Sequence, residues 1–186
     1  MAFSEEFPLL ALTFLAAPPP LPFLYPWYAI RVRSNYERTL AHYLRANDYQ
    51  EYVPLYRDRR QWSDRVREIE APLFVGYVFC RIDIQRIYTI LSAPGVVNIV
   101  GYGTKPEPIL EAEMDAIRRV SASGLRFGPH PFMHEGQRVR VRRGPLKGLE
   151  GMLLKVKQED RLVVSLELLQ RSISTEIDRL DVEPAL

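Results

Sequence analysis

The chain has 186 residues, of which 47% are hydrophobic and 26% are charged, and its formal net charge is +2. These fractions are those of an ordinary globular protein, so they exclude a largely disordered chain. A net charge this small does not by itself demand a polyanionic partner. The one cysteine, Cys80, excludes a disulfide framework and a thiolate metal cluster, and it agrees with a reducing cytoplasm.

Residues 1–26 differ in composition from the rest of the chain, because they are rich in leucine and phenylalanine and contain a run of prolines from Pro18. A secretory signal peptide would open with positive charge, whereas the first charges here are Glu5 and Glu6. The apolar stretch is also too short to span a bilayer, and proline ends it. We therefore expect a flexible extension without chemistry of its own.

Residues 27–120 alternate between strand and helix patterns. Residues 27–33 alternate apolar and polar side chains, which predicts a strand. Ser34 and Glu37 have the spacing of a capping box, so we expect a helix to begin there. A second strand is predicted at residues 49–56.

The longest apolar run after the N-terminal extension covers residues 71–83 and predicts a strand, which a charged hairpin at residues 57–67 precedes. Alternation would place Phe74 and Tyr77 on opposite faces of this strand. Both faces are apolar, so one should pack against the helices of its own domain. The other face then needs a further cover, either from this chain or from a partner.

The rest of the chain completes two predicted domains. A short helix at residues 84–91, a strand at residues 96–100 and an amphipathic helix at residues 110–120 give a β-α-β-β-α-β core. This order predicts an α+β fold of the ferredoxin-like type, with an antiparallel sheet and helices. Residues 121–134, rich in glycine and proline, are expected to be a linker. Residues 135–186 contain short strands and close turns, which predict a small SH3-like β-barrel.

Two parts of the chain resemble the NusG family. The N-terminal signature of that family is similar to Trp-Tyr at residues 27–28, Pro-Leu-Phe-Val-Gly-Tyr-Val-Phe at residues 72–79 and Ala-Pro-Gly-Val at residues 93–96. Residues 139–151 resemble a KOW motif. The resemblance covers residues 27–186 in the family's order, so the two motifs support each other.

The resemblance implies a transcription elongation or antitermination factor. In the family, the N-terminal domain docks on the clamp helices of RNA polymerase and bridges the DNA channel. The KOW domain recruits other factors, such as a termination helicase or a small-subunit ribosomal protein. Residues 60–65 and 167–172 look more like the specialised RfaH or UpxY-type paralogues, which are often antiterminators of polysaccharide operons. The alternative is a stand-alone RNA-binding or ribosome-associated protein built on the KOW barrel.

We predict three sets of binding residues. By resemblance, the polymerase-binding set is Phe74, Tyr77, Trp27, Tyr28 and Pro94. Arginines interleaved with an aromatic side chain suit phosphate contacts and base stacking, so the set expected to reach upstream or non-template DNA is Arg31, Arg33, Arg38, Arg59, Arg60 and Trp62. The factor-binding set of the KOW domain is Leu149, Leu169, Gln170 and Arg171, with Leu149 standing where family members carry an aromatic residue.

Each set has a simpler structural alternative. Aromatic residues in an apolar strand usually pack in a core, and a charged hairpin is usually a solvated surface. In RfaH the second domain can be helical when docked, but the β-branched residues here predict a barrel in the resting protein.

No enzyme is visible in the sequence. The three histidines, His42, His130 and His134, lack metal-ligand spacing, and the sequence has neither a phosphate-binding loop nor a nucleophile elbow. Cys80 lies in the apolar run and is expected to be buried and inert. We therefore expect no catalytic activity, no metal, no cofactor and no membrane association, and a monomer in the cytoplasm.

Overall fold

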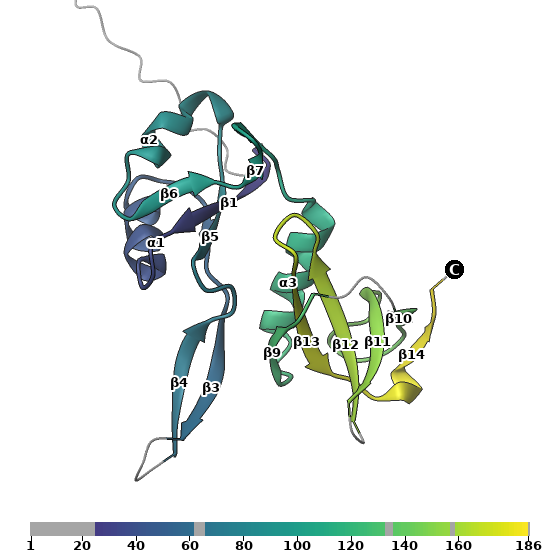
Figure 1. Cartoon of the computed structure of the whole chain (residues 1–186). Helices are drawn as coiled ribbons and strands as arrows, with labels where there is room; N and C mark the ends of the chain where they lie inside the picture. The colour runs from purple at the N-terminus through teal and green to yellow at the C-terminus, as the bar shows by residue number, and fades with distance from the viewer. Residues whose placement is uncertain (1–24, 62–65, 133–135, 157–158, 186) are drawn as a thin grey trace, which may run out of the picture.

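The computed structural model describes residues 25–61, 66–132, 136–156 and 159–185. Figure 1 shows an N-terminal unit that contains a sheet with helices, a projecting hairpin and an all-β second unit. This arrangement confirms the predicted α+β class, with a mixed first domain and a barrel-like second domain. Among the helices of the described residues, none has the length and apolar character needed to cross a bilayer.

The N-terminal unit is built on a four-stranded antiparallel sheet in the order β2-β5-β1-β6. Its strands are β1 (Trp27–Val32), β2 (Glu51–Tyr52), β5 (Tyr77–Arg81) and β6 (Val96–Ile99). One face packs against α1 (Glu37–Ala46) and the short pair η2 (Ile84–Arg86) and α2 (Ile87–Leu91), and here Ile30, Val78 and Cys80 are fully buried. The sequence predicts that one face of the central strand packs against the helices of its own domain, and in the structure the face with Val78 and Cys80 does so.

A two-stranded hairpin projects from this sheet (Figure 1). It consists of β3 (Leu55–Gln61) and β4 (Val66–Pro72), which pair in register from Leu55 opposite Pro72 to Gln61 opposite Val66. A smaller hairpin, β7 (Gly101–Tyr102) with β8 (Lys105–Pro106), follows the sheet. The predicted strand at residues 49–56 is therefore divided between the short β2 and the base of β3.

The predicted strand at residues 71–83 is wrong in one respect, because a turn at residues 73–76 separates β4 from β5. Gly76 has a φ of 83°, which favours glycine, and the Tyr77 N–H donates to the Phe74 carbonyl over 3.1 Å. The turn breaks the strict alternation. Phe74 and Tyr77 consequently belong to the same hydrophobic cluster instead of opposite faces.

The predicted capping box is also absent, and Glu37 has another role. Helix α1 begins after Tyr36 without a side-chain cap. Glu37 is buried, and its Oε1 accepts the Gly76 N–H over 2.8 Å, while the Gly76 carbonyl accepts the Val32 N–H over 2.9 Å. The spacing of Ser34 and Glu37 predicts a local helix cap, but the Glu37 carboxylate instead accepts a hydrogen bond from a turn far along the chain. Glu37 thereby fixes the turn that positions Phe74 and Tyr77.

The second unit is a six-stranded antiparallel sheet in the order β14-β10-β11-β12-β13-β9. Its strands are β9 (Phe127–His130), β10 (Gln137–Val141), β11 (Glu150–Val156), β12 (Glu159–Leu166), β13 (Arg171–Glu176) and β14 (Val182–Pro184), with the 3-10 turn η3 (Arg179–Asp181) before the last. Strand β9 lies inside the range expected to be a linker and pairs with β13. The resting second unit is thus made of strands, as its β-branched residues predict.

We predict that Glu37→Ala lowers the free energy of unfolding by about 1–3 kcal/mol, because it leaves the Gly76 N–H without its acceptor. Glu37→Gln keeps an acceptor oxygen and should retain most of the stability. Urea unfolding followed by circular dichroism measures both changes. Arg38→Ala is the matched control, since the exposed Arg38 guanidinium forms a 3.7 Å ion pair with Glu70 and a 3.5 Å hydrogen bond to the Glu70 carbonyl, and its effect should stay below about 1 kcal/mol. Equal losses for Glu37→Ala and Arg38→Ala would contradict this role.

Candidate functional site

The second face of the N-terminal sheet carries an aromatic surface. Trp27 is 1% exposed and Phe74 is 3% exposed. The Phe74 and Phe79 rings meet edge to face, with centroids 5.3 Å apart. Tyr77 packs against the same cluster and is partly buried. This face is the one that needed a further cover.

Helix α3 (Glu111–Ala122) lies at that face. Glu111 forms an ion pair with Arg81, and the Arg118 guanidinium lies 6.0 Å from the centroid of the Trp27 ring. Arg81 itself lies 4.8 Å from that centroid, so two cations lie near the Trp27 ring. Glu111 and Arg118 are about two helical turns apart and therefore share one face of α3. That face contacts the N-terminal unit.

The opposite side of α3 contacts the barrel. Glu113 Oε1 accepts the Glu167 N–H over 3.2 Å, and the Arg119 guanidinium donates to the Lys147 carbonyl. Ala116, buried, lies between these two positions on the helix surface. The buried cluster runs from the aromatic sheet face through α3 into the barrel. One helix therefore joins the two units.

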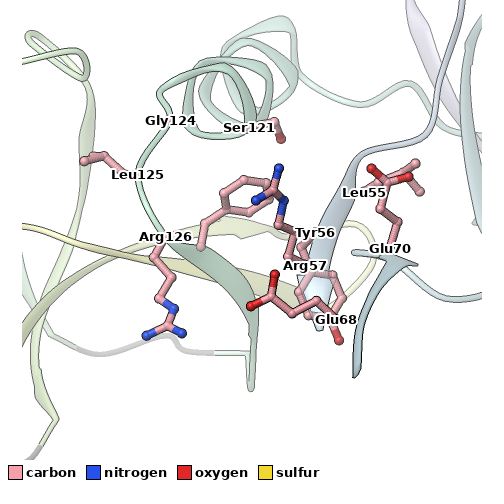
Figure 2. Close-up of a pocket in the computed structure, with 10 residues that line it drawn as sticks. Leu55, Tyr56, Arg57, Glu68, Glu70, Ser121, Gly124, Leu125 and Arg126 are labelled. Carbon is pink, nitrogen blue, oxygen red and sulfur yellow. The ribbon is translucent and has the colours of Figure 1, made fainter. Parts of the chain in front are cut away.

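The seam between the two units contains hollows. One, of about 340 Å³, lies between α3 and the barrel and is lined by Ala112, Ala116, Met152 and Val163 among others. Another, of about 550 Å³, lies between the projecting hairpin and the end of α3, and Figure 2 shows Leu55 and Glu70 on one side of it and Gly124 and Leu125 on the other. Both hollows are open to solvent, so they are clefts at the edge of the seam.

The structure brings together three of the five predicted polymerase-binding residues. Trp27, Phe74 and Tyr77 belong to the same cluster. Tyr28 is buried on the other face of the sheet, among the residues that pack on α1 and α2. Pro94 is exposed in the turn before β6, apart from the aromatic surface. The aromatic surface, defined here as Trp27, Phe74, Tyr77 and Phe79, is thus the coherent part of that set.

The predicted nucleic-acid set is divided. Arg31 and Arg33 are exposed at the end of β1, and Arg31 lies opposite Tyr77 in the register of β1 with β5. Arg38 is exposed on α1, and its guanidinium contacts the Glu70 carbonyl. The backbone of Arg59 and Arg60 lies on β3. The side chains of these two residues, and the whole of Trp62, lie outside the described residues.

The predicted factor-binding set is partly covered. Leu149 is 6% exposed and Leu169 is 8% exposed, and both belong to the cluster that includes α3. Gln170 and Arg171 are exposed. Gln170 has a φ of 50°, at the tip of the turn between β12 and β13, and its amide nitrogen donates to the Glu167 carbonyl over 2.8 Å. Leu149 and Leu169 are therefore covered while the two units are packed together, an arrangement that we call the joined form.

Two ionisable groups in the described residues have informative environments. Burial, followed by the charge of Glu51, raises the pKa of the Cys80 thiol, so that buried cysteine stays protonated. Burial at the seam also raises the pKa of Glu113; the Glu167 N–H lowers it and the Glu167 carboxylate raises it. No group of three or more His, Cys, Asp or Glu side chains in this part of the chain is placed to hold a metal ion.

The two-sided role of α3 is not among the features predicted from the sequence. The helical pattern at residues 110–120 predicts the helix but not the contacts of Glu111, Glu113 and Arg119. A usable signal was present, because small Ala112 and Ala116 lie on the side opposite Glu111 and Arg118. Small side chains on a second helix face allow another unit to approach closely.

Comparison with known proteins gives consistent matches. A family described as "NusG: Transcription termination factor nusG" matches residues 25–118. The chain is 30% identical over 172 residues to the transcription termination/antitermination protein NusG of Pseudomonas aeruginosa, with 84% of this chain and 97% of that protein covered. It is 25% identical over 181 residues to the protein of the same description from Borreliella burgdorferi, with the same coverage.

A solved structure described as "Domain interaction in Thermotoga maritima NusG" is also similar, with a TM-score of 0.53 and 20% sequence identity over 89% of this chain and 99% of that chain. At this identity the likeness shows the fold alone.

We predict that the joined form becomes less stable as the pH rises. A raised carboxyl pKa means that the joined form binds the proton more tightly than the separated form does. The contribution of Glu113 is therefore fully present below the ordinary glutamate pKa, 4.5, and is lost as the pH rises through the raised value. Energy transfer between dyes on Tyr102→Cys and Lys155→Cys, both exposed positions, measures the separation, because buried Cys80 reacts slowly.

Glu113→Gln is the control for this titration, since the amide oxygen still accepts the Glu167 N–H but carries no charge. This variant should keep high energy transfer across the pH range. A wild-type signal that does not change with pH, or an identical change in Glu113→Gln, would exclude Glu113 as the titrating group.

Proposed function

This chain belongs to the NusG family of transcription termination/antitermination factors, and on that basis we propose that it binds the clamp helices of RNA polymerase through its aromatic surface. The observation that carries this proposal is a continuous apolar surface of Trp27, Phe74 and Tyr77 on a sheet face that the domain's own α1 and α2 do not cover. A surface that accepts helices requires large apolar anchors and few charges at its centre.

Binding at this surface requires the two units to separate. Phe74 and Trp27 are almost fully buried in the joined form, as are Leu149 and Leu169 on the barrel. Helix α3 contacts both units, through the Arg81 ion pair and the Arg118–Trp27 contact on one side and through its packing on β12 on the other. We therefore expect the two units to separate, so that the aromatic surface becomes accessible and the barrel becomes free to recruit a second factor.

We also propose that exposed arginines near the aromatic surface contact nucleic acid. Arg31 lies opposite Tyr77 on the neighbouring strand, and Arg33 follows it. Once Tyr77 contacts polymerase, these cations would face upstream or non-template DNA. The β3–β4 hairpin, with Arg59 and Arg60 on its backbone, extends the same proposal outward from the sheet.

After the two units separate, we expect the barrel to recruit a second factor. Its partner would be a termination helicase or a small-subunit ribosomal protein, with Leu149 and Leu169 as the apolar anchors. We place the protein in the cytoplasm as a monomer without catalytic activity. That the protein acts on a particular operon, as RfaH-type or UpxY-type paralogues do, stays a prediction. Run-off transcription across a terminator, with and without the protein, measures whether it suppresses or promotes termination.

We predict that Tyr77→Asp weakens binding to core RNA polymerase by at least about tenfold, because it places a charge in the apolar centre of the interface. Surface-immobilised polymerase elongation complexes measure the dissociation constant. Tyr102→Asp is the matched control, since Tyr102 is 74% exposed on β7 and lies outside the cluster. Far-ultraviolet circular dichroism shows that each variant is folded.

Wild-type affinity in a folded Tyr77→Asp variant would overturn the polymerase proposal. The second candidate function, a stand-alone RNA-binding protein, rests on the exposed Arg138, Arg140 and Arg142 of the KOW segment. That function would give RNA binding that Tyr77→Asp leaves intact and that falls steeply as salt rises. Two of these arginines are already paired, Arg140 with Glu150 and Arg142 with Glu183, which favours the first candidate.

A further inference from the structure

Strand β9 makes the linker part of the barrel. The Arg126 carbonyl accepts the Glu176 N–H over 3.3 Å and the Thr175 hydroxyl over 3.1 Å. Along two antiparallel strands, residue pairs that are hydrogen-bonded alternate with pairs that are not. Because Arg126 and Glu176 form a hydrogen-bonded pair, the alternation along β9 and β13 is fixed. Pro129, opposite Ile173, then lies at a position where its missing N–H points away from β13. The residues just beyond β9 are consequently held in place relative to the barrel.

A hollow of about 600 Å³ lies beside this strand. Its linker wall is residues 129–132, and its barrel wall is residues 169–171. The barrel wall carries three of the four residues predicted to bind a factor. The linker therefore contributes half of a surface that the sequence assigned to the barrel alone.

This hollow stays open while the two units are joined. No described residue of the N-terminal unit lines it. Helix α3 contacts the barrel elsewhere, at the Glu167 N–H and the Lys147 carbonyl. Gln170 and Arg171 are exposed in the joined form, whereas Leu149 and Leu169 are buried. A partner can reach this hollow before the seam opens.

The chemistry of the hollow limits what it can bind. Pro129, Pro131 and Phe132 give it an apolar wall, and proline keeps such a wall rigid. Arg171 supplies an exposed guanidinium, which binds carboxylates well. None of the described residues that line the hollow carries a carboxylate. Positive charge beside an apolar wall fits an anion attached to an apolar group.

We propose that this hollow is a docking site for an extended protein segment that carries Asp or Glu next to a large apolar side chain. The segment binds the joined form first, through Arg171 and the wall of residues 129–132. This inference rests on the proposed role of the barrel as the recruiting domain. A nucleic acid strand is a poorer occupant, because it needs several cations along its phosphates and the hollow offers one arginine.

A library of random peptides displayed on phage and selected on the immobilised full-length protein tests the proposal. The selected peptides should be enriched in Asp or Glu adjacent to Leu, Ile, Phe or Trp. Fluorescence polarisation of a synthetic copy should show that Arg171→Glu and Phe132→Ala each weaken binding by at least about tenfold. Arg143→Glu is the matched control, because it makes the same charge change at an exposed arginine of another barrel loop.

The Arg171→Glu variant provides a second test of the proposal. Selection on Arg171→Glu should enrich Lys or Arg in place of the acidic residues. Selected peptides without acidic bias, equal binding to Arg171→Glu and wild type, or no enrichment would each overturn the proposal. Polymerase binding by Arg171→Glu, measured in parallel, should equal that of the wild type. Peptide binding that Arg171→Glu leaves unchanged thus refutes the docking site alone, whereas polymerase binding that Tyr77→Asp leaves unchanged refutes the proposed function, so the two failures are distinguishable.

Discussion

The double-sided packing of α3 is the constraint on which the joined form depends. On one side, Glu111 and Arg118 attach the helix to Arg81 and Trp27 of the N-terminal unit. On the other, Glu113 and Arg119 reach backbone groups of two barrel loops. A single buried cluster runs through the helix, so the aromatic sheet face and the apolar part of the barrel are buried together. Access to either surface is therefore coupled to access to the other.

The two sides of α3 differ in the chemistry of their contacts. An arginine stacked on tryptophan and paired with a carboxylate combines cation–π attraction with a charge-assisted hydrogen bond. The barrel side combines apolar packing on β12, the Arg119 hydrogen bond to the Lys147 carbonyl and a carboxylate whose pKa burial raises. Removing that carboxylate from water costs free energy whenever it is charged. The negative charge of Glu113 therefore opposes the joined form.

Periodicity and turn signals in the sequence predicted most of the fold. Alternation over residues 27–33 and the helical spacing of Leu40 with Leu44 reflect burial on one face, which tertiary packing preserves. The prediction failed where a long-range contact replaced a local one. Glu37 has capping-box spacing but binds the Gly76 N–H instead. That contact helps to hold a turn that the apolar pattern of residues 71–83 cannot reveal.

The sequence predicted which residues form the candidate site, but it did not predict whether they are exposed. Composition and resemblance identified Phe74, Tyr77, Leu149 and Leu169 as apolar anchors. Whether an apolar side chain is covered depends on how two separate units pack, and a single sequence carries only weak traces of that packing. The small residues on one side of α3 are such a trace. The strand at residues 127–130 was hidden by its glycine and proline, which are typical of loops and of edge strands alike.

Coupled burial of two binding surfaces has a thermodynamic consequence that does not depend on the identity of either partner. A ligand that binds only the separated form shifts the population toward it by its differential affinity. If polymerase takes the aromatic surface, the barrel is released, and its affinity for a second factor rises by a fixed ratio. Linkage requires that the second factor raise the affinity for polymerase by the same ratio. A site that stays open in the joined form, beside β9, lies outside this coupling. It would let a partner associate without first overcoming the closed seam.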